Sequence, residues 1–246
     1  MKKVVSVQKV LTFLAATGLA FSFICGTVGC TTADVGSKPS CKTVKELDNS
    51  AFYKGGKFDR EVARNAYFDM CKRFNFPIFP SFLEDKGYFW VADWGQGDFA
   101  SCGMGGVIYL NEKKEGYFSH DIFLLPNQHI AEHRHMPTKD KDGKTIRCKM
   151  ESWVVRHGYI YGFSEIGEPN LDKYPEAKAM ISKKQIPYLK CVHVDKWTAD
   201  GRAHKLAKDE SWHFMLAGPE GAIVTESATF HDNAGLRFSI PSIKSF

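Results

Sequence analysis

Two histidines one residue apart, His133 and His135, are the residues of this chain whose spacing most directly suggests chemistry. Because side chains alternate between the two faces of a strand, both imidazoles are expected to point the same way. Glu151 follows on what we expect to be the next strand, seven residues before Gly158. Two imidazoles and a carboxylate on one face of a sheet are ligands for a divalent metal ion. The sequence therefore predicts a metal site here.

A third imidazole is available from His213, which lies on a late predicted strand that can pair beside the two earlier histidines. Three imidazoles and one carboxylate suit Mn, Fe, Co, Ni or Zn. Water or substrate would take the remaining coordination positions, as in catalytic metal sites. The alternative is coincidence, because the chain has nine histidines and exposed strands often carry them at alternate positions.

Two more charged residues could act beside such a site. Lys149 lies two residues before Glu151, so strand alternation places both on one face. Glu226 lies within a predicted strand over residues 222–230. Facing inward among apolar neighbours, its carboxyl group would have a raised pKa and could serve as a base. Facing outward, it would be an ordinary surface carboxylate, and the sequence leaves both readings open.

Short runs rich in aromatic and β-branched residues must carry these side chains, with Gly, Pro, Asn and Asp between the runs. Many short strands that do not alternate with helices predict an all-β sandwich or barrel. A polar stretch at 164–186 interrupts them, with a helical turn expected near 175–181. The predicted strands are residues 88–92, 106–110, 119–125, 130–135, 146–156, 159–163, 189–194, 211–216, 222–230 and 236–240.

One amphipathic helix is predicted ahead of the strands. It begins after Asp59, a suitable N-cap, and ends before Pro77. Its apolar residues recur at helical spacing, which predicts that one face packs against the sheet; they are Val62, Ala66, Tyr67, Met70 and Phe74.

The beginning of the chain has the pattern of a secretory signal peptide, predicted for residues 1–29. A positive segment with Lys2, Lys3 and Lys9 precedes an apolar run over residues 10–24. After the run, Thr27-Val28-Gly29-Cys30 resembles a bacterial lipobox, which predicts lipidation of the Cys30 thiol. We expect an exported protein with a flexible tether over 30–58 and one domain over 59–246. Its contact with a membrane would be through the lipid anchor alone; ordinary cleavage would instead release it to the periplasm or the medium.

Charge and cysteine usage exclude other classes. The 246-residue chain has a formal net charge of +5, and three of its lysines lie in the predicted signal peptide. No cluster of Lys and Arg with aromatic residues indicates nucleic-acid binding. Beyond Cys30, five cysteines show no C-x-x-C spacing, which argues against a zinc ribbon or a thioredoxin-like motif. Cys71 and Cys148 are expected to be buried, inert thiols; the others are Cys41, Cys102 and Cys191.

The His-x-His pair followed by a Glu seven residues before a Gly resembles the first motif of the cupin barrel. This resemblance implies a small β-barrel or jelly roll, here with an N-terminal helix. Residues 136–150 are longer than the usual motif allows, and Gly143 among alternating charges predicts an inserted hairpin loop. Such an insertion leaves the two strand ends in place at small cost.

A narrower resemblance covers residues 59–240, to the cupin-fold D-lyxose ketol-isomerases. It is carried by residues 89–99, 124–135, 149–153 and 213–221, and the Ala-Gly-Pro-Glu-Gly of residues 217–221 is its most specific part. The resemblance implies that one divalent metal ion, Mn²⁺ first among the candidates, is bound by His133, His135, Glu151 and His213. It also implies a homodimer, and a free sugar such as D-lyxose or D-mannose as substrate.

In that chemistry an aldose and a ketose interconvert by proton transfer between C1 and C2. A carboxylate moves the proton, a role we assign to Glu226, while Lys149 steadies an oxygen. We expect the aromatic side chains Trp153, Trp212 and Phe214 to form an apolar surface for the sugar. Two alternatives stay open: a sugar-binding cupin without catalysis, tethered to the cell surface, and an iron-dependent dioxygenase on the same barrel.

Overall fold

The structure is a computed structural model that describes residues 47–85 and 87–244. The predicted signal peptide, the lipidation site Cys30 and Cys41 lie outside the described residues. Among the helices that are described, none has the length and apolar character needed to cross a membrane.

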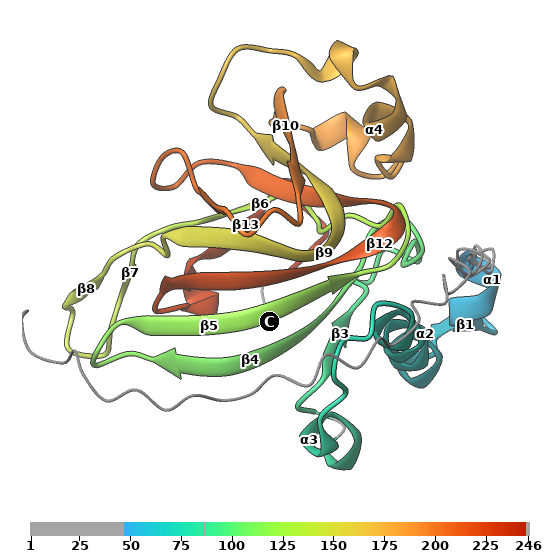
Figure 1. The fold of residues 1–246 in the computed structure, drawn as a ribbon. Helices are drawn as coiled ribbons and strands as arrows, with labels where there is room; N and C mark the ends of the chain where they lie inside the picture. The colour runs from blue at the N-terminus through green and yellow to red at the C-terminus, as the bar shows by residue number, and fades with distance from the viewer. Residues whose placement is uncertain (1–46, 86, 245–246) are drawn as a thin grey trace, which may run out of the picture. The chain divides into compact units, whose positions relative to one another are not determined.

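An antiparallel sheet of nine strands curls around the centre of the described domain (Figure 1). Six strands are neighbours in the order β10-β9-β12-β5-β4-β3, while β11 pairs with β9, β6 with β12, and β13 with β6. The strands are β3 (Trp90–Ala92), β4 (Met104–Glu112), β5 (Tyr117–Leu124), β6 (His133–His135), β9 (Glu151–Ser164), β10 (His193–Thr198), β11 (Ala203–Lys205), β12 (His213–Thr229) and β13 (Leu236–Phe238). The all-β prediction is confirmed.

Each of the two longest strands, β9 and β12, joins two runs that we predicted as separate strands. The prediction placed a break at Gly158 and another at residues 217–221. Instead the register of the two strands shifts there, and Gly158 (φ 70°) and Gly221 (φ 85°) adopt left-handed backbone conformations. A Cβ atom on Gly158 would overlap the carbonyl oxygen of Gly221. Glycine thus lets both strands bend without ending.

The predicted amphipathic helix is confirmed as α2 (Arg60–Arg73). The carboxylate of its N-cap, Asp59, accepts a hydrogen bond from the backbone N–H of Val62 at 3.1 Å. The buried face of the helix packs in one apolar cluster with Phe123 and Ile223 from strands β5 and β12. A second cluster, with Leu124 from β5, fills the inside of the curl. Because neighbours along a strand alternate in direction, β5 contributes to both clusters.

The predicted tether is wrong in its last part. Residues 49–58 form the short helix α1 (Asn49–Phe52) and a two-stranded hairpin of β1 (Tyr53–Lys54) and β2 (Lys57–Phe58). The side chain of Phe52 is fully buried and meets the ring of Phe99 edge to face at 4.8 Å. Aromatic burial therefore draws this polar-looking segment into the domain. A further short helix, α3 (Pro80–Glu84), follows α2.

The polar interruption of the sheet contains the predicted helical turn as α4 (Pro175–Met180), with 3₁₀ turns at Leu171–Lys173 and Ile186–Tyr188. The Glu132 carboxylate ties it to the barrel by accepting hydrogen bonds from the backbone N–H groups of Lys190 and Cys191, each at 2.8 Å.

Strand β10 begins four residues later than predicted, and β11 was not predicted. The expected insertion is a hairpin of β7 (Thr138–Lys139) and β8 (Thr145–Ile146).

The four described cysteines, Cys71, Cys102, Cys148 and Cys191, are free thiols in buried positions. The prediction for Cys71 and Cys148 is therefore confirmed. Burial raises the pKa of Cys71 to about 12 and also raises the pKa of Cys148.

Candidate metal centre and cavity

The structure brings the four predicted metal ligands together from three neighbouring strands. The potential ligand atoms of His133, His135, Glu151 and His213 all lie within 4.8 Å of one another. Strand β6 supplies the first two histidines, and it pairs with β12 so that His133 faces His213 across the ladder. Glu151 opens the adjacent strand β9. The sheet itself therefore assembles the cluster.

Hydrogen bonds to backbone carbonyls orient two of these imidazoles. Nδ1 of His133 donates to the carbonyl of Ala131, and Nδ1 of His213 donates to the carbonyl of Ser211, both at 2.9 Å. Because a carbonyl oxygen can only accept, Nδ1 carries the proton in each ring. The lone pair then lies on Nε2, and that atom is left to bind a cation.

Several polar atoms inside the cluster are buried and make no hydrogen bond. These are Nε2 of His135, Nε2 of His213 and Oε2 of Glu151. Oε1 of Glu151 lies 3.2 Å from Nε2 of His135, and Oε2 lies 2.7 Å from Nε2 of His213. Buried polar atoms without partners are costly, so their convergence on one point fits a bound divalent cation.

The environment of the cluster favours the metal-binding form of three of its four residues. Burial, reinforced by the neighbouring imidazoles, lowers the pKa of His133 well below its ordinary value, and burial also lowers that of His135. Burial acts to raise the pKa of Glu151, but Lys149 and the nearby histidines outweigh it and hold the pKa well below the usual range. For His213, the Glu151 carboxylate outweighs burial and raises the pKa. A bound cation would displace that proton.

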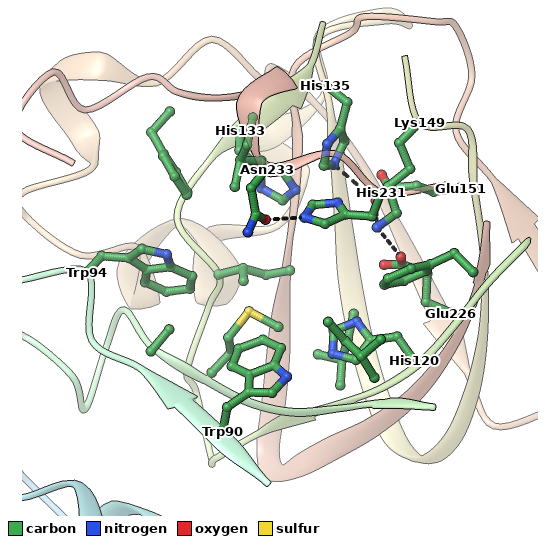
Figure 2. Close-up of a pocket in the computed structure, with 18 of the residues that line it drawn as sticks. Trp90, Trp94, His120, His133, His135, Lys149, Glu151, Glu226, His231 and Asn233 are labelled. Carbon is green, nitrogen blue, oxygen red and sulfur yellow. Dashed lines mark hydrogen bonds and ion pairs between the residues drawn. The ribbon is translucent and has the colours of Figure 1, made fainter. Parts of the chain in front are cut away.

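Beside the cluster lies the buried pair predicted to be catalytic. Nζ of Lys149 is 2.9 Å from Oε1 of Glu151 and also forms an ion pair with Oε1 of Glu226 (Figure 2). Nε1 of Trp153 donates a hydrogen bond to Oε2 of Glu226 at 3.1 Å. Glu226 therefore faces inward, which resolves the alternative left open by the sequence. Burial raises the pKa of Glu226, in part against the attraction of Lys149.

A cavity of about 370 Å³ opens in front of these groups, a size that suits a small organic ligand. His133, His135, Glu151 and Glu226 lie on one side of it, and two indoles, Trp90 and Trp94, lie on the other (Figure 2). The rest of the lining is mostly apolar. It consists of Arg60, Val91, Ala92, Met104, Ile108, Phe118, His120, Ile122, Ile130, Lys149, His231, Asn233, Leu236 and Phe238.

The aromatic surface predicted for the sugar is wrong, because Trp153, Trp212 and Phe214 are not among the residues that line the cavity. Trp212 and Phe214 flank His213 in sequence, so strand alternation turns them to the other side of the sheet. Phe214 stacks on Phe163 at 4.1 Å, and the guanidinium of Arg134 lies 4.7 Å from the Trp212 ring. The Trp153 indole instead holds the Glu226 carboxylate.

Other cavity residues were missed as site residues. Trp90 and Trp94 belong to residues 89–99, which carried the family resemblance, so their sequence did contain a signal. His120 is opposite Glu226 in the pairing of β5 and β12, but no motif singles it out. His231 and Asn233 lie in the loop after β12, and a loop has no periodicity that predicts which way its side chains point.

Known proteins with similar sequences are sugar isomerases, although no family model matches the chain. The D-lyxose/D-mannose isomerase of Thermosediminibacter oceani is 30% identical over 187 residues, which are 75% of this chain and 92% of that protein. The D-lyxose ketol-isomerase of Cohnella laeviribosi is 30% identical over 183 residues, 74% of this chain and 91% of that protein. The chain belongs to the D-lyxose ketol-isomerase family. The predicted family and enzyme class are confirmed.

Solved structures confirm the cupin-type fold of this family member. The L-ribose isomerase of Cellulomonas parahominis superposes with a TM-score of 0.54 at 13% identity, covering 75% of this chain and 93% of that one. The L-ribose isomerase of Acinetobacter sp. DL28, solved with L-ribose, gives a TM-score of 0.53 at 16% identity, with coverage of 74% and 91%. At these identities the likeness establishes the fold alone.

Proposed function

We propose that this protein is a metal-dependent aldose–ketose isomerase that acts on a free sugar of the D-lyxose or D-mannose type. The observation that carries the proposal is the position of Glu226. Its carboxylate is buried beside the four-residue cluster and lies on the wall of a cavity of sugar size. Family membership supports the reaction class, and the relatives named above supply the candidate sugars.

The metal ion would be held by His133, His135, Glu151 and His213, and we propose Mn²⁺, with Zn²⁺, Fe²⁺, Co²⁺ or Ni²⁺ able to use the same donors. When bound, such an ion polarises the oxygens of C1 and C2 and stabilises negative charge that develops on them. The ring nitrogens and the carboxylate oxygen described above, which are buried and make no hydrogen bond, support this assignment.

The proposed proton path uses Glu226. Its carboxylate takes the proton from C2 of the aldose and returns it to C1, while a proton moves from the oxygen of C2 to the oxygen of C1, so that no atom is gained or lost. A buried carboxylate with a raised pKa is suited to hold this proton between the two steps. Lys149 pairs with Glu226 and carries the positive charge that offsets two buried carboxylates.

Proton exchange in D₂O tests this function. The full chain, loaded with Mn²⁺, is expected to incorporate deuterium at C2 of D-lyxose or D-mannose and to form the matching ketose. The Glu226→Gln variant should keep its metal content and bind the sugar without exchange. The absence of exchange across a panel of aldopentoses and aldohexoses would contradict the proposal. Sugar binding without exchange would then favour a sugar-binding cupin without catalysis. Oxygen uptake in the presence of Fe²⁺ would favour an iron-dependent dioxygenase.

We also propose that the protein is exported, lipidated at Cys30 and homodimeric. The first two rest on the segment over residues 1–30, and the third on the family resemblance. Incorporation of labelled palmitate into the wild type, but not into the Cys30→Ser variant, would test lipidation. Light scattering would test the dimer.

A further inference from the structure

The loop that follows β12 carries two residues of the cavity wall, His231 and Asn233. Nε2 of His231 donates a hydrogen bond to Oδ1 of Asn233 at 2.7 Å (Figure 2). In this arrangement the oxygen of the Asn233 amide faces the imidazole. The amide nitrogen, Nδ2, is then directed away from His231 and toward the open part of the cavity. It makes no hydrogen bond to another described residue.

The loop is held from two sides. On one side, Asn111 of β4 donates from Nδ2 to the carbonyl of His231 at 2.9 Å and accepts from its N–H at 3.0 Å. On the other side lies the inserted hairpin, where Oγ1 of Thr138 donates to Oδ2 of Asp232 at 2.5 Å. The N–H of Met136 also donates to the carbonyl of Gly235 at 2.8 Å. The insertion thus braces the loop that presents Asn233.

The cavity wall around Asn233 lies beside the metal cluster, because Leu236 and Phe238 of β13 pair with His135 and His133 of β6. Leu236 and Phe238 are apolar. Of the other donors of the lining, Nε1 of Trp90 is buried without a hydrogen-bond partner, and Nη1 of Arg60 donates to the carbonyl of Val91. If C1 and C2 react at the metal, as proposed above, Asn233 stands near the carbons that follow them, because the ring of its partner His231 lies 5.4 Å from the ring of His135. In a mostly apolar wall, one correctly placed donor discriminates strongly between sugars.

We propose that Asn233 is a specificity-determining residue, which donates a hydrogen bond from Nδ2 to a sugar hydroxyl beyond C2. The inserted hairpin positions it through the contact between Thr138 and Asp232. The inference rests on the proposed isomerase function for the placement of C1 and C2.

A comparison of D-lyxose with its 3-deoxy, 4-deoxy and 5-deoxy analogues tests the assignment. The Asn233→Ala variant of the full, Mn²⁺-loaded chain should lose about tenfold in kcat/KM for D-lyxose, the upper end of what one hydrogen bond contributes, since the Asn233 side chain is exposed in the free protein. One analogue should be turned over equally by wild type and variant, because it lacks the hydroxyl that Asn233 binds. An equal loss for all four sugars, or no loss, would overturn the assignment.

A matched pair of substitutions tests the role of the hairpin. Thr138→Val removes the hydroxyl that holds Asp232, and we expect a loss of roughly threefold in kcat/KM for D-lyxose with the same analogue insensitive. Thr145→Val, at an exposed position of the same hairpin, should leave both values unchanged. Equal behaviour of the two variants would refute the positioning role.

Failure of this inference can be told apart from failure of the proposed function. If the wild type exchanges no sugar, the isomerase function fails, and D-lyxose is then titrated calorimetrically into the Mn²⁺-loaded wild type and the Asn233→Ala variant. Binding about tenfold weaker in the variant would support Asn233 as a sugar ligand. Equal binding, or none, would reject it. Melting temperature and metal content, measured for each variant, identify any that fails to fold.

Discussion

The two sides of the cavity are built from different kinds of structure. The metal cluster and Glu226 stand on the paired strands β6, β9 and β12, where register fixes the direction of every side chain. The opposite side is formed largely by β3 and the segment that continues it, which carry Trp90 and Trp94, while the loop after β12 brings Asn233 to the edge of the cluster. Strands hold groups more rigidly than loops do. The comparison indicates that the reaction is set by the strands and the choice of sugar by the loops.

Removal of the metal should give the largest effect, since it disables the strand side alone. After dialysis against a chelator, we expect C2 proton exchange to fall about 10⁴-fold, the effect of losing a Lewis acid at the reacting oxygens. Added Mn²⁺ should restore it, and elemental analysis should follow the loss and return of the ion. Full exchange in metal-free protein would show that the strand side of the cavity does not need a metal ion for the reaction.

Glu226→Gln should give the next largest effect. The amide keeps the shape of the side chain but cannot take a proton, so we expect exchange to fall about a thousandfold. Metal content should stay at the level of the wild type, because Glu226 is not one of the four clustered residues. A variant that exchanges normally would assign the base to another residue.

Trp153→Phe should give an effect of about tenfold on kcat, because it deletes one hydrogen bond to the catalytic carboxylate. The phenyl ring can keep the stacking contact with Trp197, whose ring lies 5.9 Å away. The bond from Trp153 lowers the pKa of Glu226. Without it the pKa rises, so the base stays protonated to higher pH and the acid limb of the rate profile moves upward. If the acid limb of the rate profile does not move, Trp153 does not influence the protonation of Glu226.

On the loop side, Trp94→Phe should give the smallest effect. We expect KM for D-lyxose to rise roughly fivefold with kcat nearly unchanged, since only packing against the sugar is altered. Trp212→Phe is the matched control, because that indole lies outside the cavity, and its KM should stay unchanged. If Trp212→Phe raised KM more than Trp94→Phe did, the sugar would bind at the aromatic surface predicted from the sequence.

The same contrast explains what the sequence could predict. His133, His135 and Glu151 follow strand periodicity, and periodicity translates directly into a shared face. The direction of Glu226 stayed open, because a single Glu in an apolar strand fits either face. His231 and Asn233 could not be predicted, since their direction depends on hydrogen bonds from Asn111 and Thr138, both distant in sequence.

The errors in the fold have physical causes of the same kind. Gly158 and Gly221 are typical of turns, but here they allow close approach inside two continuous strands. The aromatic surface was misplaced because Trp212 and Phe214 alternate with His213. The tether was drawn too long because Phe52 finds its aromatic partner Phe99 far along the chain.

The place of β12 in the sheet has a consequence for folding order. This strand lies between β9 and β5, yet it is made after both, and it brings His213 and Glu226 with it. During folding the two earlier strands therefore cannot be joined before their shared neighbour is available, and the metal cluster cannot be completed without β12. Pairings between such distant segments slow folding. The activity should consequently appear in one late, cooperative step, once the segment that contains β12 is free to pair.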